Sequence, residues 1–181
     1  MKKGKIVEIP FSAGMFSDFH IPVTPQNLSK IAYPKDYTIN DGIVIGEHDG
    51  CENYSLGQRK RKLTLDQKEP YFVIGIDQNT DTLYVGKGAN HPGLWTKVLR
   101  FHRSTVAFDH QFMMEENHCE IAVLSSLMAN PQYASLSSDD EYIYLQFEKC
   151  IPIAILDTDL KLMANHRQIA IIDQFCIKCE V

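Results

Sequence analysis

The chain has 181 residues, of which 44% are hydrophobic and 23% are charged, and its formal net charge is −5. This composition excludes a disordered tail and is typical of a globular protein with one ordinary domain or two small ones. No window approaches eighteen uncharged apolar residues, and Glu8 and Pro10 interrupt the apolar run behind the basic start. We therefore expect no membrane span, no secretory signal and a cytoplasmic location.

Charge is distributed unevenly along the chain. Residues 1–103 contain 14 Lys and Arg against 11 Asp and Glu, whereas residues 104–181 contain 4 against 12. A nucleic acid would therefore be attracted by the first part and repelled by the second.

In residues 1–40, KIVEI (5–9) predicts a short strand. Thr24 and Pro25 are suited to the N-cap and the first turn of a helix that we expect to run from Gln26 to Ala32.

From Gly42 onward the pattern becomes that of β-strands. GIVIG (42–46) predicts one strand, and YFVIGI (71–76) and TLYVG (82–86) predict a hairpin around an Asp-rich and Asn-rich loop.

The second part predicts further strands at residues 119–124, 141–147, 150–156 and 167–177, separated by turn-forming residues. We expect residues 95–103 to be a connection and Ser135–Asp140 to be a solvated loop. The predicted fold is mostly β with few short helices: a small central β-rich domain followed by a six-stranded antiparallel β-barrel. The predicted division is an N-terminal segment 1–40, a central domain 41–100 and a barrel-like domain 101–181.

Three sequence motifs lie within residues 42–94: GEHDG (46–50), SLGQRK (55–60) and YVGKGANHPGL (84–94). Their order and spacing resemble the central domain of the tRNA 2-thiouridylase family, whose members replace an oxygen of the wobble uridine with sulfur. FEKCIPIAIL (147–156) resembles the C-terminal barrel of that family more faintly. The resemblance covers roughly residues 36–178.

The strongest electrostatic feature is the basic run formed by Gln58, Arg59, Lys60, Arg61 and Lys62. Adjacent cations bind phosphates without sequence specificity. The resemblance places Arg59 and Lys60 on the surface that faces RNA, and Lys87 could add a phosphate contact. The alternative is an ordinary solvated loop, and RKLTLDQK (61–68) replaces the glycine-rich turn that the family usually has.

His48 and His91 each lie in a glycine-containing turn, and each could mark a site or only a turn. For His48 we favour a turn that needs open dihedral angles. For His91 the following proline forces an extended backbone, and we interpret the HP step as architecture.

The five cysteines form an odd set with no disulfide framework, so we expect reduced thiols. Cys176 and Cys179 form a single CxxC pair without the further ligands that a structural zinc site requires. We expect no metal and no cofactor, with zinc or redox use of this pair as the less favoured alternative.

The resemblance also implies parts that we do not find. The family reaction uses an ATP-binding domain with an SGGxDS loop, and the nearest segment here, Ser12–Ser17, has Ala13 and Phe16 where glycine and aspartate are expected. Only about two dozen residues separate this segment from the central domain, too few for the repeated strand–helix units of a nucleotide-binding sheet. In addition, Cys119–Leu127 lacks the family's basic KxRYRQ pattern.

We therefore expect no catalytic residue. The chain is interpreted as a non-catalytic relative that binds tRNA or supports a separately encoded catalytic sulfurtransferase subunit. The alternative is a protein-interaction module that uses the acidic second part, and the least favoured is an enzyme that uses His48 or the CxxC pair.

Overall fold

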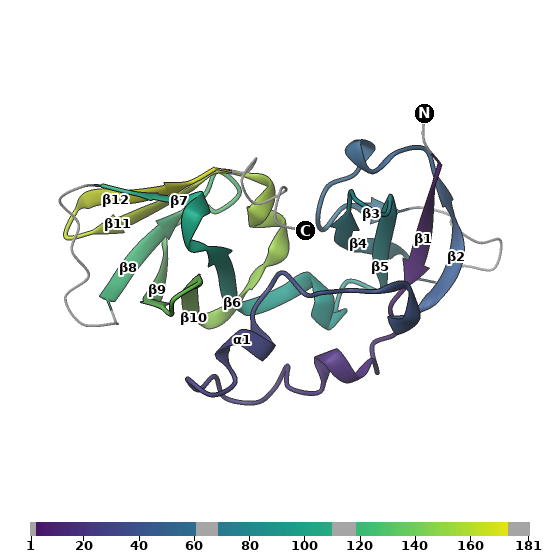
Figure 1. The fold of residues 1–181 in the computed structure, drawn as a ribbon, viewed down its shortest axis with the longest axis horizontal. Helices are drawn as coiled ribbons and strands as arrows, with labels where there is room; N and C mark the ends of the chain where they lie inside the picture. The colour runs from purple at the N-terminus through teal and green to yellow at the C-terminus, as the bar shows by residue number, and fades with distance from the viewer. Residues whose placement is uncertain (1–2, 61–68, 110–118, 174–181) are drawn as a thin grey trace.

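Two β-sheets lie side by side in the computed structural model, which describes residues 3–60, 69–109 and 119–173 (Figure 1). The first sheet has the strand order β2-β1-β5-β4-β3. Its strands are β1 (Gly4–Glu8), β2 (Ile43–His48), β3 (Arg59–Lys60), β4 (Tyr71–Asp77) and β5 (Thr82–Lys87). The pairing of β1 with β5 is parallel, and the other pairings in this sheet are antiparallel.

The second sheet is antiparallel and curled into a half-barrel, with the order β6-β10-β9-β8-β11-β12-β7. Its strands are β6 (Trp95–His102), β7 (Val106–Phe108), β8 (Cys119–Leu124), β9 (Gln132–Ser138), β10 (Tyr142–Pro152), β11 (Leu160–Ala164) and β12 (Arg167–Ile172).

The helical elements are short. The α-helix α1 spans Leu28–Ile31. The 3-10 turns are η1 (Gly14–Phe16), η2 (Ile39–Asp41), η3 (Cys51–Asn53), η4 (Pro92–Leu94), η5 (Arg103–Thr105) and η6 (Ile153–Asp157). No helix in the described ranges is both long and apolar enough to cross a membrane.

The mostly β fold class is confirmed, including a small first sheet followed by a barrel-like second sheet. The second sheet has seven strands within the described residues, where the sequence predicted six. The extra strands come from segments that we expected to be irregular. Residues 95–103, predicted as a connection, contain β6, and Ser135–Asp140, predicted as a solvated loop, contains the end of β9. Both predictions were wrong because β10 pairs with β6 on one side and with β9 on the other.

The other predicted elements differ in detail. The strand at 5–9 and the hairpin at 71–86 are present as β1 and as β4 with β5. The predicted strands at 141–147 and 150–156 form one long strand, β10, followed by η6. The predicted helix is shorter than expected, because Asn27 rather than Thr24 lies at its N-cap and the Asn27 side chain accepts a hydrogen bond from the Thr24 N–H (2.7 Å).

The middle strands of the first sheet, β1, β5 and β4, are buried on both faces. Successive residues of a strand point to opposite faces, and Ile6 and Val7 of β1 accordingly belong to two different hydrophobic clusters. The second sheet encloses one large cluster, in which Leu99, Leu136 and Leu145 are completely buried. The first sheet is therefore a thin layer with packing on either side, and the second is a single curved wall around its own core.

Tyr33 links the two sheets. Its backbone N–H donates to Val98 O (2.9 Å), and its carbonyl accepts from Arg100 N–H (2.8 Å), so that it pairs with β6 of the second sheet. Its buried hydroxyl donates to Ile74 O (3.0 Å) in β4 of the first sheet. A second link joins the Leu56 N–H to the Asp157 carboxylate (2.6 Å).

Candidate nucleic-acid interface

Arg59 and Lys60 form β3, the short strand at one edge of the first sheet. In the register of the sheet, Lys60 lies opposite Tyr71, which in turn lies opposite Lys87. Directly opposed residues share a face of a sheet, so Lys60, Tyr71 and Lys87 form a row across three strands. The Tyr71 hydroxyl donates to Glu8 (2.6 Å), and burial, together with this carboxylate, raises the pKa of Tyr71 to about 12. Tyr71 is therefore neutral between the two cations at physiological pH.

Gln58 shapes the turn that leads into β3. Its side-chain Oε1 accepts from Ser55 N–H (3.1 Å), and its own N–H donates to Ser55 O (3.1 Å). Gly57 has a φ of 74°, a conformation that suits glycine, and its N–H donates to Val73 O (2.8 Å). These contacts make Gln58 a turn-forming residue with its amide oxygen already engaged.

The described cations of the basic run differ in exposure. Arg59 is exposed, and so is Lys87 on β5, whereas Lys60 is half-buried. The Lys60 ammonium donates to the Tyr54 hydroxyl (2.7 Å) and lies 3.9 Å from the centroid of the Tyr54 ring, a cation–π contact. Arg59 and Lys87 therefore offer the more accessible charges, and Arg61 and Lys62 lie outside the described residues.

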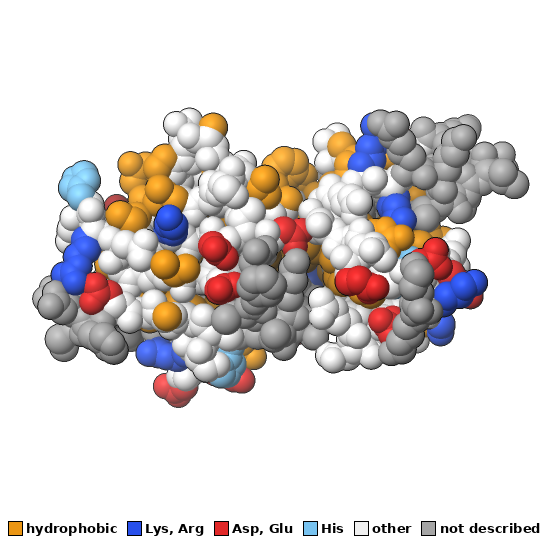
Figure 2. All heavy atoms as spheres, turned by 90° about the horizontal axis from the view of Figure 1, so that it is seen from above, with side chains coloured by type: hydrophobic (Ala, Val, Ile, Leu, Met, Phe, Trp, Pro, Cys, Tyr) orange, Lys and Arg blue, Asp and Glu red, His pale blue; other side chains and the backbone are white. Residues whose placement is uncertain are grey.

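Acidic side chains are prominent elsewhere on the surface. Figure 2 shows Asp and Glu side chains over the middle of one face, and both acidic and basic side chains toward its two ends. A polyanion would meet a favourable potential only over part of this surface.

His48 is buried at the end of β2, with an exposed fraction of 3%. Gly50 N–H donates to its Nδ1 (3.2 Å), so the ring proton lies on Nε2, which donates to Asp81 O (3.1 Å). The Cys51 sulfur lies 3.7 Å from Nε2, and the Tyr54 ring contacts the imidazole edge-on at 5.5 Å. Both ring nitrogens are thus engaged within the protein.

His91 has the same arrangement at the other end of the sheet. Gly93 N–H donates to its Nδ1 (3.1 Å), and its Nε2 donates to Ile9 O (3.0 Å). Burial lowers the pKa of His91 below its ordinary value, although the hydrogen bond to Ile9 acts in the opposite direction. The imidazole is therefore neutral and holds η4 against the segment that follows β1.

The Ser12–Ser17 segment, the nearest match in the sequence to the family's ATP loop, contains η1. Phe16 is buried and contacts the His91 ring edge-on at 5.2 Å. Ala13 and Met15 pack against the same cluster. The segment covers one face of the first sheet with apolar side chains.

The cysteine pair proposed as a less favoured alternative, Cys176 and Cys179, lies outside the described residues. Among residues 3–60, 69–109 and 119–173, no group of three His, Cys, Asp or Glu side chains is arranged to hold a metal ion.

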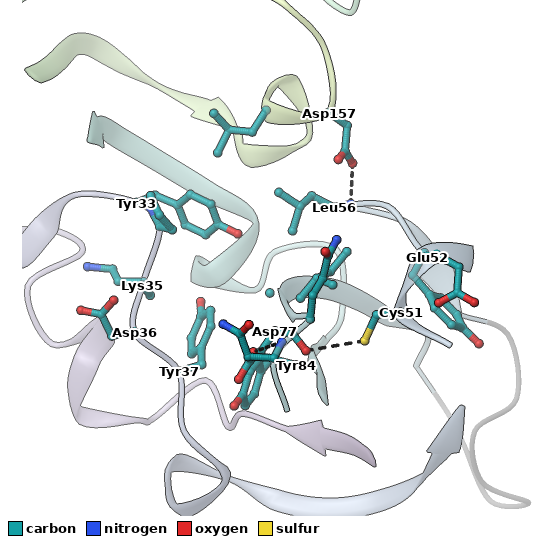
Figure 3. Close-up of a pocket in the computed structure, with 17 residues that line it drawn as sticks. Tyr33, Lys35, Asp36, Tyr37, Cys51, Glu52, Leu56, Asp77, Tyr84 and Asp157 are labelled. Atoms are coloured by element: carbon teal, nitrogen blue, oxygen red, sulfur yellow. Dashed lines mark hydrogen bonds between the residues drawn. The ribbon is translucent and has the colours of Figure 1, made fainter. Parts of the chain in front are cut away.

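A pocket of about 300 Å³ lies between the two sheets, and no motif of the sequence predicts it (Figure 3). Its wall comes from five separate segments, around Tyr33–Tyr37, Cys51–Leu56, Gly75–Asn79, Tyr84 and Leu156–Asp157. No single motif contains these residues, and only the packing of the two sheets brings them together. Sequence reasoning could have noted the aromatic residues of YPKDY (33–37), but that pattern alone does not predict a pocket.

Comparison with known families gives a match over part of the first sheet. Residues 35–87 match the model of the tRNA methyl transferase PRC-barrel domain. This range contains η2, the Gln58 turn and four of the five strands of the first sheet, β2 to β5.

Comparison with curated proteins extends the similarity into the second sheet. A tRNA-specific 2-thiouridylase from Karelsulcia muelleri is 32% identical over 147 residues, which is 81% of this chain and 37% of the relative. One from Christiangramia forsetii is 26% identical over 152 residues, covering 82% of this chain and 38% of the relative. One from Halalkalibacterium halodurans is 45% identical over 69 residues, covering 38% and 19%. The chain thus spans well under half the length of these relatives.

Proposed function

Because the chain belongs to the tRNA-specific 2-thiouridylase family over the region that these alignments cover, we propose that it binds tRNA as a non-catalytic module in wobble-uridine thiolation. In this proposal a separately encoded catalytic sulfurtransferase subunit supplies the ATP-dependent chemistry. The proposal also includes a cytoplasmic location.

The observation that carries the proposal is the position of the basic residues within the matched range. Arg59, Lys60 and Lys87 lie on β3 and β5 at one end of the first sheet, inside or at the end of residues 35–87. Exposed cations at this end of the sheet would neutralise phosphates and release counterions, which gives affinity without base readout. Lys60 contributes less in this proposal, because Tyr54 already contacts its ammonium.

The acidic charge of the second part of the chain favours tRNA contact with the first sheet alone. Residues 104–181 carry 12 acidic against 4 basic side chains. Phosphates would be repelled there, so the tRNA backbone would contact the β3 and β5 end of the first sheet.

The test is tRNA binding measured by fluorescence anisotropy between 50 and 200 mM salt. We expect the variant with Arg59→Ala and Lys87→Ala to bind tRNA about tenfold more weakly at low salt. We also expect the slope of log affinity against log salt to fall by about 2, since two phosphate contacts are removed.

The matched control is Lys149→Ala with Lys161→Ala, which removes the same charge from exposed positions of the second sheet. This control should leave both affinity and slope unchanged. Equal weakening by the two pairs would contradict the proposed interface.

A protein-interaction module is the second candidate. The acidic balance of residues 104–181 supports it, as do two exposed apolar side chains beside that sheet, Tyr133 (76% exposed) and Leu127 (58%). Failure of the wild-type chain to bind tRNA at 50 mM salt would favour this candidate over the first.

A further inference from the structure

The pocket between the two sheets has the size and the wall of a small-molecule site. Its volume of about 300 Å³ is at the lower end of the range for ligand pockets. The apolar part of the wall comes from Leu56, Ile76 and Leu156 and from tyrosine rings. Tyr37 and Tyr84 contact each other with ring centroids 5.3 Å apart and planes inclined by 33°. Such surfaces favour a flat aromatic ligand.

The Tyr37 hydroxyl is the polar group in this wall whose bonding is unexplained. Tyr37 is only 9% exposed, and its hydroxyl has no hydrogen-bond partner among the described residues. Figure 3 shows this hydroxyl directed toward the interior of the pocket, on the side of Tyr33. Leaving a buried hydroxyl unpaired destabilises the protein, and a ligand that formed this bond would recover that free energy.

The neighbouring tyrosine hydroxyls differ from Tyr37. Tyr33 donates to Ile74 O (3.0 Å), and the Tyr54 hydroxyl accepts from Lys60 (2.7 Å). Gly75 allows the Tyr37 ring to lie on β4, because a Cβ at that position would lie 2.6 Å from the ring. The ring is thus fixed in place, and no residue that the structure describes bonds to its hydroxyl.

The charged groups in the wall decide which aromatic ligand fits. Four carboxylates line the pocket, those of Asp36, Glu52, Asp77 and Asp157, whereas Lys35 is the one ammonium among the lining residues. Three of them already have partners within the protein: Asp36 pairs with Arg100 (3.6 Å), Asp77 accepts from Asn79 N–H (2.9 Å) and Asp157 from Leu56 N–H (2.6 Å). The Lys35 ammonium already donates to Lys30 O (2.7 Å) and Ile31 O (3.0 Å). An excess of carboxylates repels phosphate and accepts hydrogen bonds from amino groups.

We propose that this pocket binds a phosphate-free heteroaromatic ring with an exocyclic amino group, the chemistry of an aminated nucleobase or its nucleoside. The Tyr37 hydroxyl forms a hydrogen bond to a ring nitrogen, and a wall carboxylate accepts from the amino group. The pocket borders the proposed tRNA surface at Tyr54, whose hydroxyl accepts from Lys60, but its ligand does not depend on tRNA being bound.

The test is titration calorimetry of the full chain with adenosine, inosine and adenosine monophosphate at low salt. We expect saturable adenosine binding and at least fivefold weaker binding of inosine, which lacks the amino group. We also expect at least fivefold weaker binding of the monophosphate, because of the carboxylates. No saturable adenosine binding at millimolar concentration, or a monophosphate that binds as well as adenosine, would overturn the proposal.

The decisive variant is Tyr37→Phe, with Tyr133→Phe on β9 as its matched control. Tyr37→Phe removes a hydroxyl that has no partner in the described part of the chain, so its melting temperature should equal or exceed that of the wild type. We expect it to weaken adenosine binding at least fivefold, whereas Tyr133→Phe leaves binding unchanged. Unchanged adenosine affinity in a folded Tyr37→Phe protein would overturn the proposal.

An unstacked base of RNA presents the same ring as a free nucleoside. A further titration therefore distinguishes a free nucleoside from an RNA base as the ligand. A short single-stranded oligoadenylate is titrated into the wild type and into the Arg59→Ala, Lys87→Ala variant. The proposal expects adenosine affinity to be equal in both proteins. It also expects adenosine not to be displaced by the oligonucleotide. Displacement by the oligonucleotide, or tighter binding of N-acetyl-arginine amide than of adenosine, would count against the assigned ligand.

Discussion

The turns at His48 and His91 have the same local hydrogen bonds in two different settings. Each histidine accepts at Nδ1 from the N–H of the glycine two residues later and donates from Nε2 to a backbone carbonyl of a distant segment. Each ring also packs on a strand glycine, Gly4 for His48 and Gly86 for His91.

The settings differ in what lies beyond the ring. His91 contacts Phe16 in an apolar cluster, whereas His48 contacts Tyr54, whose hydroxyl and ring hold Lys60. The same turn is therefore a core element at His91, and at His48 it supports Lys60 through Tyr54. Two histidines that look like site residues in the sequence are explained by hydrogen bonding to the backbone.

The largest expected effect comes from removing the rings. His91→Ala should lower the free energy of unfolding by about 3–4 kcal/mol, through a cavity and two lost hydrogen bonds. His48→Ala should cost about 2–3 kcal/mol, since its ring has fewer apolar neighbours. Urea unfolding measures both, and an equal or reversed order would contradict the contrast drawn between the two settings.

Substituting the glycines that contact the two rings should lower the free energy of unfolding somewhat less. A Cβ at Gly86 would lie 2.4 Å from the His91 ring, so Gly86→Ala should destabilise by about 2–3 kcal/mol. Most of that loss should disappear in a His91→Ala background. A Cβ at Gly4 would also lie 2.0 Å from Asp81 O. His48→Ala should therefore not relieve Gly4→Ala. Gly46→Ala, whose nearest neighbour would be 4.0 Å away, is the control.

A smaller effect is expected from pH. The pKa of His91 is lowered by burial, so below about pH 6.5 the unfolded chain binds a proton that the folded chain resists. The contribution of His91 to stability is therefore present at neutral pH and is lost as the pH falls, by at most about 1.4 kcal/mol per pH unit. His91→Asn should flatten the dependence of unfolding free energy on pH between 7 and 5, and an unchanged slope would contradict this assignment.

The smallest effect concerns the coupling between the His48 turn and the basic strand. Tyr54→Leu removes the contact with Lys60 and should weaken tRNA binding by about two- to threefold, because Lys60 loses its fixed position. Phe16→Leu, the corresponding change beside His91, should leave tRNA affinity unchanged. Anisotropy at 50 mM salt distinguishes the two variants, and weakening by Phe16→Leu would argue against a local role for Tyr54.

Much of the fold could be predicted from the sequence because several strands have β-branched and aromatic residues in short runs. The strands β4, β5 and β8 are of this kind. The missed strands lack that signal. In β9, serines alternate with buried Leu136, and in β6, Lys97 and Arg100 separate buried residues. Pairing with β10 stabilises both strands, and such tertiary context is invisible in a local pattern.

The candidate sites were predictable to different degrees. The cations at Arg59, Lys60 and Lys87 could be named from the sequence, because charge and motif are local properties. The accessibility of each cation could not be predicted, since the contact of Lys60 with Tyr54 depends on the path of the chain between them. The pocket around Tyr37 was not predictable, because residues as far apart in the sequence as Tyr37 and Asp157 line one pocket only when the two sheets pack.

Tyr33 restricts how the two sheets could move relative to each other when a large partner binds. One residue is hydrogen-bonded through its backbone to β6 and through its hydroxyl to β4, so a hinge between the sheets would have to break the bonds on one side. A rigid orientation means that a molecule gripping both sheets loses little affinity to ordering them. Tyr33 therefore sets the relative orientation of the two sheets before any partner binds.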